Sequence, residues 1–187
     1  TYDTEWANVS NTPFRLYKQW IHEGGISTPM ILRWPEVIEP GNINREPAQL
    51  IDVMPTLVDV AQTSYPENYE GHPVLPMEGK SLFPIFNGNE MVENGPLFWE
   101  FRGSRAVRKG PWKLVAERGK PWQLYHISKD RTERHDVSDD HPDLTRELGK
   151  QYDRWAKRTG ARNNEKAVGM SPVQQDRYLY KKEKDKH

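Results

Sequence analysis

Residues 11–35 read NTPFRLYKQWIHEGGISTPMILRWP, and we expect the rest of the chain to be organised around this stretch near its start. The glycine pair Gly24-Gly25 predicts a turn, because glycine adopts positive φ without steric cost. The apolar run at residues 29–32 lies between prolines, which is typical of a short strand buried on both faces of a sheet. Lys18 would then lie in a loop at the rim of that sheet, where ligands bind in α/β proteins.

The composition of the chain sets limits on its size and class. Its 187 residues allow one domain, or one domain with a small appendage. Hydrophobic residues make up 35% of the chain and the mean hydropathy is -0.94, which is low for an independent globular core. Two explanations fit, and we expect both to apply. A polar C-terminal tail lowers the average, and the chain is part of a larger fold whose apolar strands lie elsewhere.

The charge and the cysteine count exclude several classes. The chain has 27 basic and 27 acidic residues, and this balance argues against nucleic acid as a partner. It has no apolar run long enough to cross a membrane, so we expect no membrane partner. No signal peptide is visible at the start, which says nothing about export if the chain is a fragment. The absence of cysteine excludes disulfides and cysteine ligands and leaves the compartment open.

The second half of the chain predicts a small antiparallel sheet with a covering helix. Four short runs rich in aromatic and β-branched residues, separated by glycine or proline, predict strands at residues 97–101, 104–108, 112–116 and 122–127. Residues 143–157 form an amphipathic helical pattern that would cover the sheet. We expect four tryptophans to share one core between sheet and helix: Trp99, Trp112, Trp122 and Trp155. The expected domains are 1–90 (main α/β domain), 91–162 (sheet and helix) and 163–187 (polar tail).

A helix is also predicted at residues 48–62, where apolar residues recur at three- and four-residue steps. Pro55 lies inside this pattern, so we expect a kink or a fresh helix start with Asp52 as its cap. For Asp52 we favour this structural role over a functional one.

Several motifs together resemble the second half of the type I sulfatases of the alkaline phosphatase superfamily, and bacterial arylsulfatases most of all. They are Arg15-Leu16-x-Lys18 before Glu23-Gly24-Gly25, the D-x-x-P-T pattern that starts at Asp52, Gly79-Lys80-Ser81-Leu82, and residues 99–114. The resemblance covers roughly residues 5–160. It implies the C-terminal part of a sulfatase α/β fold, with the small four-stranded sheet packed against the C-terminal helix.

The resemblance also implies site residues. From the residues alone, Lys18 is either an anion-binding lysine or a surface lysine. By resemblance it falls on the family lysine that contacts a sulfate oxygen, which makes it a catalytic and substrate-binding residue. His22 is a second candidate for substrate binding, with a structural role as the favoured alternative. We expect Arg15 to be an anchor and Glu23 to brace the turn by accepting backbone N–H groups.

The nucleophile motif and the calcium ligands that the resemblance implies are missing from this chain. The family nucleophile is a formylglycine made in a C/S-x-P-x-R motif, but here Ser27-Thr28-Pro29 is followed by Ile31 where arginine is required. Asp3 and Asp52 do not match the family's calcium ligands, so no metal ligand is assigned. Ca²⁺ and formylglycine are therefore expected in an N-terminal half of the same enzyme, which would be the partner of this chain. The chain alone is expected to be inactive.

Other implications and alternatives remain open. The whole enzyme would act on a sulfated small molecule or glycan in the periplasm or outside the cell. Seven tryptophans and eight tyrosines would also suit a non-catalytic carbohydrate-binding or interaction module. A phosphate or phosphonate ester hydrolase of the same superfamily is a third reading, because a fold does not fix a substrate. Phe101 stands where many relatives have histidine, which leaves the specificity open.

Overall fold

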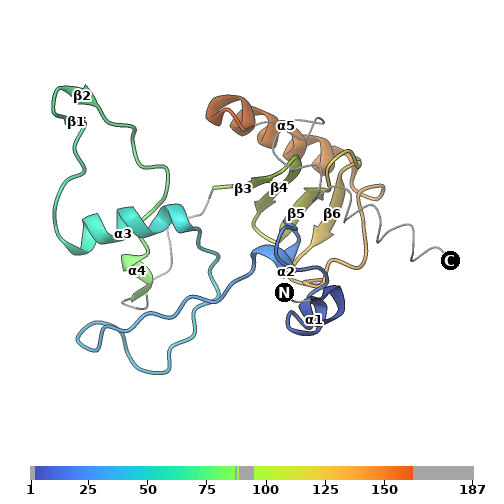
Figure 1. The fold of residues 1–187 in the computed structure, drawn as a ribbon, viewed down its shortest axis with the longest axis horizontal. Coiled ribbons are helices and arrows are strands. Elements are labelled where there is room, and N and C mark those ends of the chain that lie inside the picture. Colours follow the sequence, from blue (N-terminus) through green and yellow to red (C-terminus); the bar gives the residue numbers. More distant parts are fainter. Residues whose placement is uncertain (1–2, 87, 89–94, 162–187) are drawn as a thin grey trace. The chain divides into compact units, whose positions relative to one another are not determined.

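The computed structural model describes residues 3–86, 88 and 95–161. These residues form two compact units (Figure 1). Unit 1 combines the N-terminal segment up to Pro29 with the residues from Asn94 onward, and unit 2 runs from Met30 to Glu93. The expected domain boundaries stay a prediction, and the tail at 163–187 lies outside the described residues. In this chain the Lys18 segment belongs to the same unit as the small sheet.

Unit 1 is built on a four-stranded antiparallel sheet with the strand order β3-β4-β5-β6 (Figure 1). The strands and the helix that follows them are β3 (Leu97–Phe101), β4 (Ser104–Lys109), β5 (Trp112–Ala116), β6 (Gln123–His126) and α5 (Pro142–Thr159). Two-residue turns join the first three strands, and both Arg102 and Gly103 in the first turn have positive φ, as a type I′ turn requires. The predicted sheet and helix are confirmed.

The sheet is buried on both faces. On one face, Val107, Leu114 and Leu124 pack against α5. On the other, a second cluster contains Ala106, Val115, Tyr125 and Ile127 from the sheet region, together with Ile21 and Ile26 from the N-terminal segment. The alternation of side chains along each strand sends neighbouring residues to these two different cores.

The expected single tryptophan core was wrong for Trp99. Trp112, Trp122 and Trp155 pack on the α5 side, where the Trp155 ring stacks on Phe98 with centroids 5.1 Å apart. Trp99 packs in the opposite cluster. The register explains this, because Trp99 pairs with Ala106 while Phe98 pairs with Val107, and adjacent residues of a strand point to opposite faces.

The N-terminal segment of unit 1 contains two short helices, α1 (Thr4–Val9) and α2 (Glu23–Ile26). Ile21 is 3% exposed and Ile26 packs beside it, so the segment around α2 forms the cover of the second sheet face. A cover on this face explains why the strands carry apolar residues on both sides.

Unit 2 contains a short 3₁₀ turn, two helices and a small hairpin: η1 (Leu50–Asp52), α3 (Val53–Val60), β1 (Asn68–Tyr69), β2 (His72–Pro73) and α4 (Phe83–Phe86). The helix predicted at 48–62 is therefore shorter, and α3 starts afresh with Pro55 in its first turn, where proline is tolerated. No described helix has the length and apolar character needed to cross a membrane.

Asp52 has the structural role that we expected, although its carboxylate caps η1 and not α3. It accepts the backbone N–H of Gln49 at 2.7 Å and that of Lys80 at 2.9 Å. Thr56 donates to the Asp52 carbonyl oxygen at 2.6 Å and accepts the N–H of Leu82 at 2.8 Å. The D-x-x-P-T pattern thus holds the segment at 79–82 against η1 and α3.

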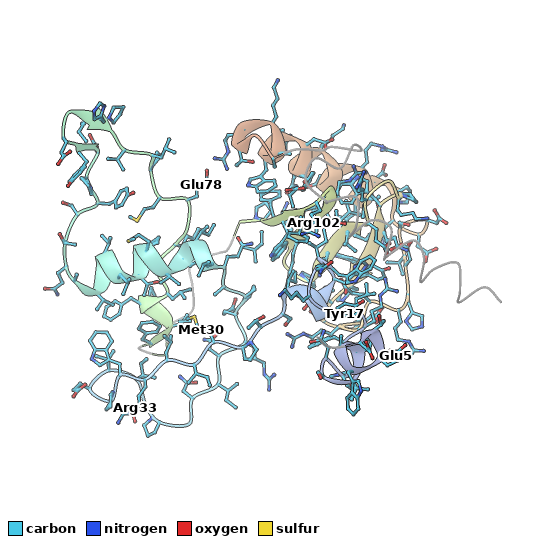
Figure 2. The ribbon with its side chains drawn as sticks, viewed as in Figure 1. Glu5, Tyr17, Met30, Arg33, Glu78 and Arg102 are labelled. Atoms are coloured by element: carbon cyan, nitrogen blue, oxygen red, sulfur yellow. The ribbon has the colours of Figure 1, made fainter. Side chains whose placement is uncertain are left out.

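The strand expected at residues 29–32 is wrong for the described chain. The segment is not part of a β-ladder, and Ile31 is 92% exposed (Figure 2 labels Met30 in this segment). A buried strand needs neighbouring strands to satisfy its backbone groups, and none of the strands within the described residues pairs with this one.

Candidate functional site

The candidate site is the loop at residues 11–26, which carries Lys18. The Asn11 side-chain amide donates to the carbonyl oxygens of Leu16, at 2.7 Å, and of Gly24. One side chain therefore joins the backbone on both sides of Lys18. In Figure 2, Tyr17 lies near the lower ends of the strands in that view, away from α5.

The two glycines of the predicted turn are required by close backbone approach and not by positive φ. A Cβ on Gly24 would overlap the carbonyl oxygens of Arg15 and Leu16, and a Cβ on Gly25 would overlap that of Trp20. Instead of an open turn, the pair lies inside the short helix α2. The loop is packed so tightly on itself that only glycine fits at these positions.

Lys18 is exposed, and its backbone surroundings are unusual. Leu16, two residues before it, has φ 64°, and Gln19, just after it, has φ 90°. Non-glycine residues rarely adopt positive φ, and such conformations persist only where the surrounding structure holds them. Backbone of this kind is found at functional sites, so its occurrence on both sides of Lys18 supports the hypothesis that the loop has a functional role.

A buried ion cluster attaches this loop to the sheet. The Lys113 ammonium on β5 donates to Glu23 Oε1 at 2.9 Å and forms an ion pair with Glu133 Oε1, also at 2.9 Å. The Lys113 and Glu133 side chains are 0% and 1% exposed, and that of Glu23 is 4% exposed. The Glu23 backbone N–H also donates to Glu133 Oε2 at 2.7 Å. Glu23 therefore binds through its side chain as well as its backbone.

The expected role of Glu23 needs correction, because its carboxylate binds cationic side chains: Lys113, and the half-exposed Arg131 at 3.6 Å. Burial raises the pKa of the Glu133 carboxyl, and the nearby Lys113 ammonium works against this shift. Two carboxylates around one buried ammonium are costly to desolvate, so the cluster by itself is weak evidence for added stability of the fold.

His22 is fully buried between the loop and the sheet. Its ring lies edge-on to that of Tyr125 with centroids 6.5 Å apart. Burial, aided by the positive charges of Arg15 and Lys113, lowers the pKa of His22 to about 3, so its imidazole is neutral at physiological pH. The substrate-binding role of His22 stays a prediction, and its burial favours the structural alternative.

Arg15 has the contacts of an anchor. Its guanidinium donates to the Tyr125 hydroxyl at 3.5 Å and lies 5.8 Å from the centre of the Tyr125 ring. Burial raises the pKa of Tyr125 to about 12, so the hydroxyl remains protonated. Ser27, which begins the incomplete nucleophile motif, accepts a hydrogen bond from Arg131 at 3.0 Å.

The sequence analysis missed Lys113, Glu133 and Asn11. One signal for Lys113 was available, since alternation in β5 places it on the same face as Val115, opposite Trp112 and Leu114. A lysine on a strand with apolar residues on both faces needs a buried partner. Nothing in the sequence indicates that this partner would be a pair of glutamates, residues 23 and 133.

The residues that the structure describes do not provide a ligand set for the calcium ion implied by the resemblance. Among them, no group of three or more histidine, aspartate or glutamate side chains could hold a metal ion. The two glutamates that do meet, Glu23 and Glu133, share the Lys113 ammonium as their cationic partner. No step of the chemistry is therefore assigned to a metal bound by this part of the chain.

The buried state of His22 predicts a pH dependence of stability. Its folded pKa of about 3 lies below the usual value of 6.5, so between these values the unfolded chain binds a proton that the folded chain does not. The free energy of unfolding should fall as pH drops from about 6.5, with a slope from this residue approaching about 1.4 kcal/mol per pH unit. His22→Gln should make the curve shallower between pH ~6.5 and ~5, measured by urea unfolding. An unchanged slope would show that His22 is not buried in its neutral form.

Comparisons with known proteins agree on one family. The family described as N-sulphoglucosamine sulphohydrolase, C-terminal, matches residues 14–158. An uncharacterised sulfatase of Schizosaccharomyces pombe is 35% identical over 154 residues, which cover 79% of this chain and 28% of that protein. A sulfatase of Formosa agariphila is 32% identical over 122 residues, which cover 64% of this chain and 21% of that protein.

Solved structures show the same fold. A crystal structure of Ps i-CgsB has a TM-score of 0.67 and 28% identity, over 78% of this chain and 32% of that one. The chain thus spans well under half the length of each of these three relatives. Because the family match at residues 14–158 covers most of the sequence, this chain belongs to the N-sulphoglucosamine sulphohydrolase C-terminal family and is a C-terminal portion of a sulfatase.

Proposed function

We propose that this chain supplies the sulfate-binding lysine, Lys18, to a sulfatase that hydrolyses sulfate esters. The observation that most supports this proposal is the structure of the loop. Lys18 is exposed and lies between two residues with positive φ, on a segment that buried ion pairs attach to the sheet. A flexible surface lysine needs no such support. A lysine that must bind an anion at one fixed position needs such support, because its stabilisation of the anion depends on preorganisation.

The proposed role of Lys18 in the reaction is electrostatic. In the transition state of sulfate ester cleavage, negative charge builds up on the leaving oxygen while the sulfuryl oxygens keep their negative charge. A fixed ammonium next to these oxygens stabilises that state more than the intact ester. Sulfatases generally use formylglycine as the nucleophile together with Ca²⁺, and we propose that both come from the N-terminal part of the enzyme. The chain alone would then be inactive.

The proposed substrate is a sulfate ester on a sugar or another small molecule. Two relatives support the glycan class. One is an ulvan-active sulfatase of Formosa agariphila, 25% identical over 189 residues. The other is Ps i-CgsB, which has also been crystallised with a neocarrahexaose. A periplasmic or secreted location, expected from the resemblance, stays a prediction.

The proposed partner is the N-terminal part of the same enzyme, and it would cover the apolar surface of unit 2. Large hydrophobic side chains are exposed there to an extent that an independent unit rarely shows: Met30, Ile31, Leu32, Ile43, Leu50, Ile51, Met54, Leu57, Tyr69 and Leu75. The relatives are about three to five times longer than the matched segment, so they have ample chain to cover this surface.

The role of Lys18 is tested in the full-length enzyme. Lys18→Ala should lower kcat by about 10²–10³, the usual cost of losing one such donor, with little change in thermal stability. Lys18→Arg should not restore the full rate, because a planar guanidinium does not replace a compact ammonium. Steady-state kinetics with a sulfate ester and thermal melts give both values.

Lys120→Ala is the matched control, because Lys120 is another exposed lysine of unit 1, between β5 and β6. It should leave kcat unchanged. If Lys18→Ala kept kcat within about threefold of the parent, the barrier would change by less than about 1 kcal/mol and Lys18 would be an ordinary surface lysine.

The partner proposal is tested by Ile31→Asp in two settings. In the isolated chain, where Ile31 is 92% exposed, the substitution should change the free energy of unfolding by no more than about 0.5 kcal/mol. In the full-length enzyme it should cost about 3 kcal/mol or more, because it would bury an unpaired carboxylate. Urea unfolding of both proteins measures this difference. Equal small effects in the two proteins would mean that nothing covers this surface.

A further inference from the structure

We propose that Lys113 is a positioning residue for Lys18: from inside the sheet, its ammonium fixes the turn that sets the Lys18 loop. The inference rests on the proposed function of Lys18. Lys113 is 0% exposed, so it cannot itself reach a substrate from solvent. Its effect must pass through the residues that it binds.

The first step runs from Lys113 to Glu23. The ammonium lies 2.9 Å from a carboxylate oxygen of Glu23 and 2.9 Å from one of Glu133. The other oxygen of Glu133 accepts the Glu23 backbone N–H at 2.7 Å. Lys113 thus holds the Glu23 side chain directly and the Glu23 backbone through Glu133. Two points of attachment fix the position and the orientation of this residue, which one contact would not.

The second step runs from Glu23 to Lys18. Gly24 follows Glu23, and its carbonyl oxygen accepts a hydrogen bond from Asn11. The same Asn11 amide binds the Leu16 carbonyl oxygen at 2.7 Å. Leu16 has φ 64° and stands two residues before Lys18. The path from the sheet to Lys18 is therefore continuous and is made only of hydrogen bonds, one ion cluster and short pieces of backbone.

The type of residue at position 113 supports positioning over simple stability. Well-packed apolar side chains usually stabilise a core as well as a buried ion cluster does, because charges are costly to desolvate. A methionine would fill nearly the same volume at this buried position, but it would not orient two carboxylates. The structure keeps a charge where an apolar residue would serve for burial alone.

The test is a double-mutant cycle in the full-length enzyme, with Lys18→Ala, Lys113→Met and the pair. In the parent background, Lys113→Met should lower kcat by about 10- to 100-fold, the usual result of a displacement near one ångström. In the Lys18→Ala background the same change should cost less than about threefold, because Lys113 acts through Lys18. A purely structural role would give the same loss in both backgrounds.

Glu133→Gln is the second variant, in case Lys113→Met folds poorly. Its amide oxygen can still accept the Glu23 N–H, but the ion pair with Lys113 is lost. It should show a smaller loss of kcat with the same dependence on Lys18. Lys120→Ala changes an exposed lysine that is not a member of the ion cluster, so it should have no effect in either background.

The outcomes separate the two proposals. If Lys18→Ala lowers kcat while Lys113→Met and Glu133→Gln cost the same with and without Lys18, the positioning role is wrong and the function of Lys18 stands. If Lys18→Ala leaves kcat within about threefold of the parent, the proposed function fails and the positioning role fails with it. If the losses vanish in the Lys18→Ala background, both are supported.

Discussion

The buried ammonium of Lys113, between the carboxylates of Glu23 and Glu133, is the interaction on which unit 1 depends. It joins three parts of the chain that are distant in sequence: the N-terminal loop, the central strand β5 and the connection between β6 and α5. Removing Lys113 would leave two carboxylates in the core without their ammonium, at a cost of about 3–5 kcal/mol. The cluster therefore makes the loop and the sheet one structural body.

This arrangement explains why both faces of a small sheet are buried. α5 covers one face with Leu148, Tyr152 and Ala156. The N-terminal loop covers the other with Ile21, while the charges of Glu23 and Lys113 lie in the same layer. A substrate-binding lysine on that loop would be held as rigidly as the sheet. Electrostatic stabilisation of a transition state requires such a fixed position.

The sequence predicted the elements with strong local signals and missed those that depend on distant partners. Strands β3 to β6 and helix α5 were predictable, because glycine and proline punctuate them and their apolar residues recur with a clear period. The face on which Trp99 lies depends on register, which its own run does not reveal. The segment at 29–32 has an apolar run but pairs with none of the described strands, which the local pattern does not reveal. The contacts among Glu23, Lys113 and Glu133 join parts of the chain that are far apart in sequence, so no local signal predicts them.

Amide hydrogen exchange at Glu23 tests the central claim, attachment of the loop to the sheet, most directly. The Glu23 N–H is bound to the buried Glu133 carboxylate, so it can exchange only when the ion cluster opens. This amide, followed by NMR, should exchange with an opening free energy close to that of the amides in β5. Exchange as fast as that of the exposed Lys18 and Gln19 amides would contradict it, because the loop would then move independently of the sheet.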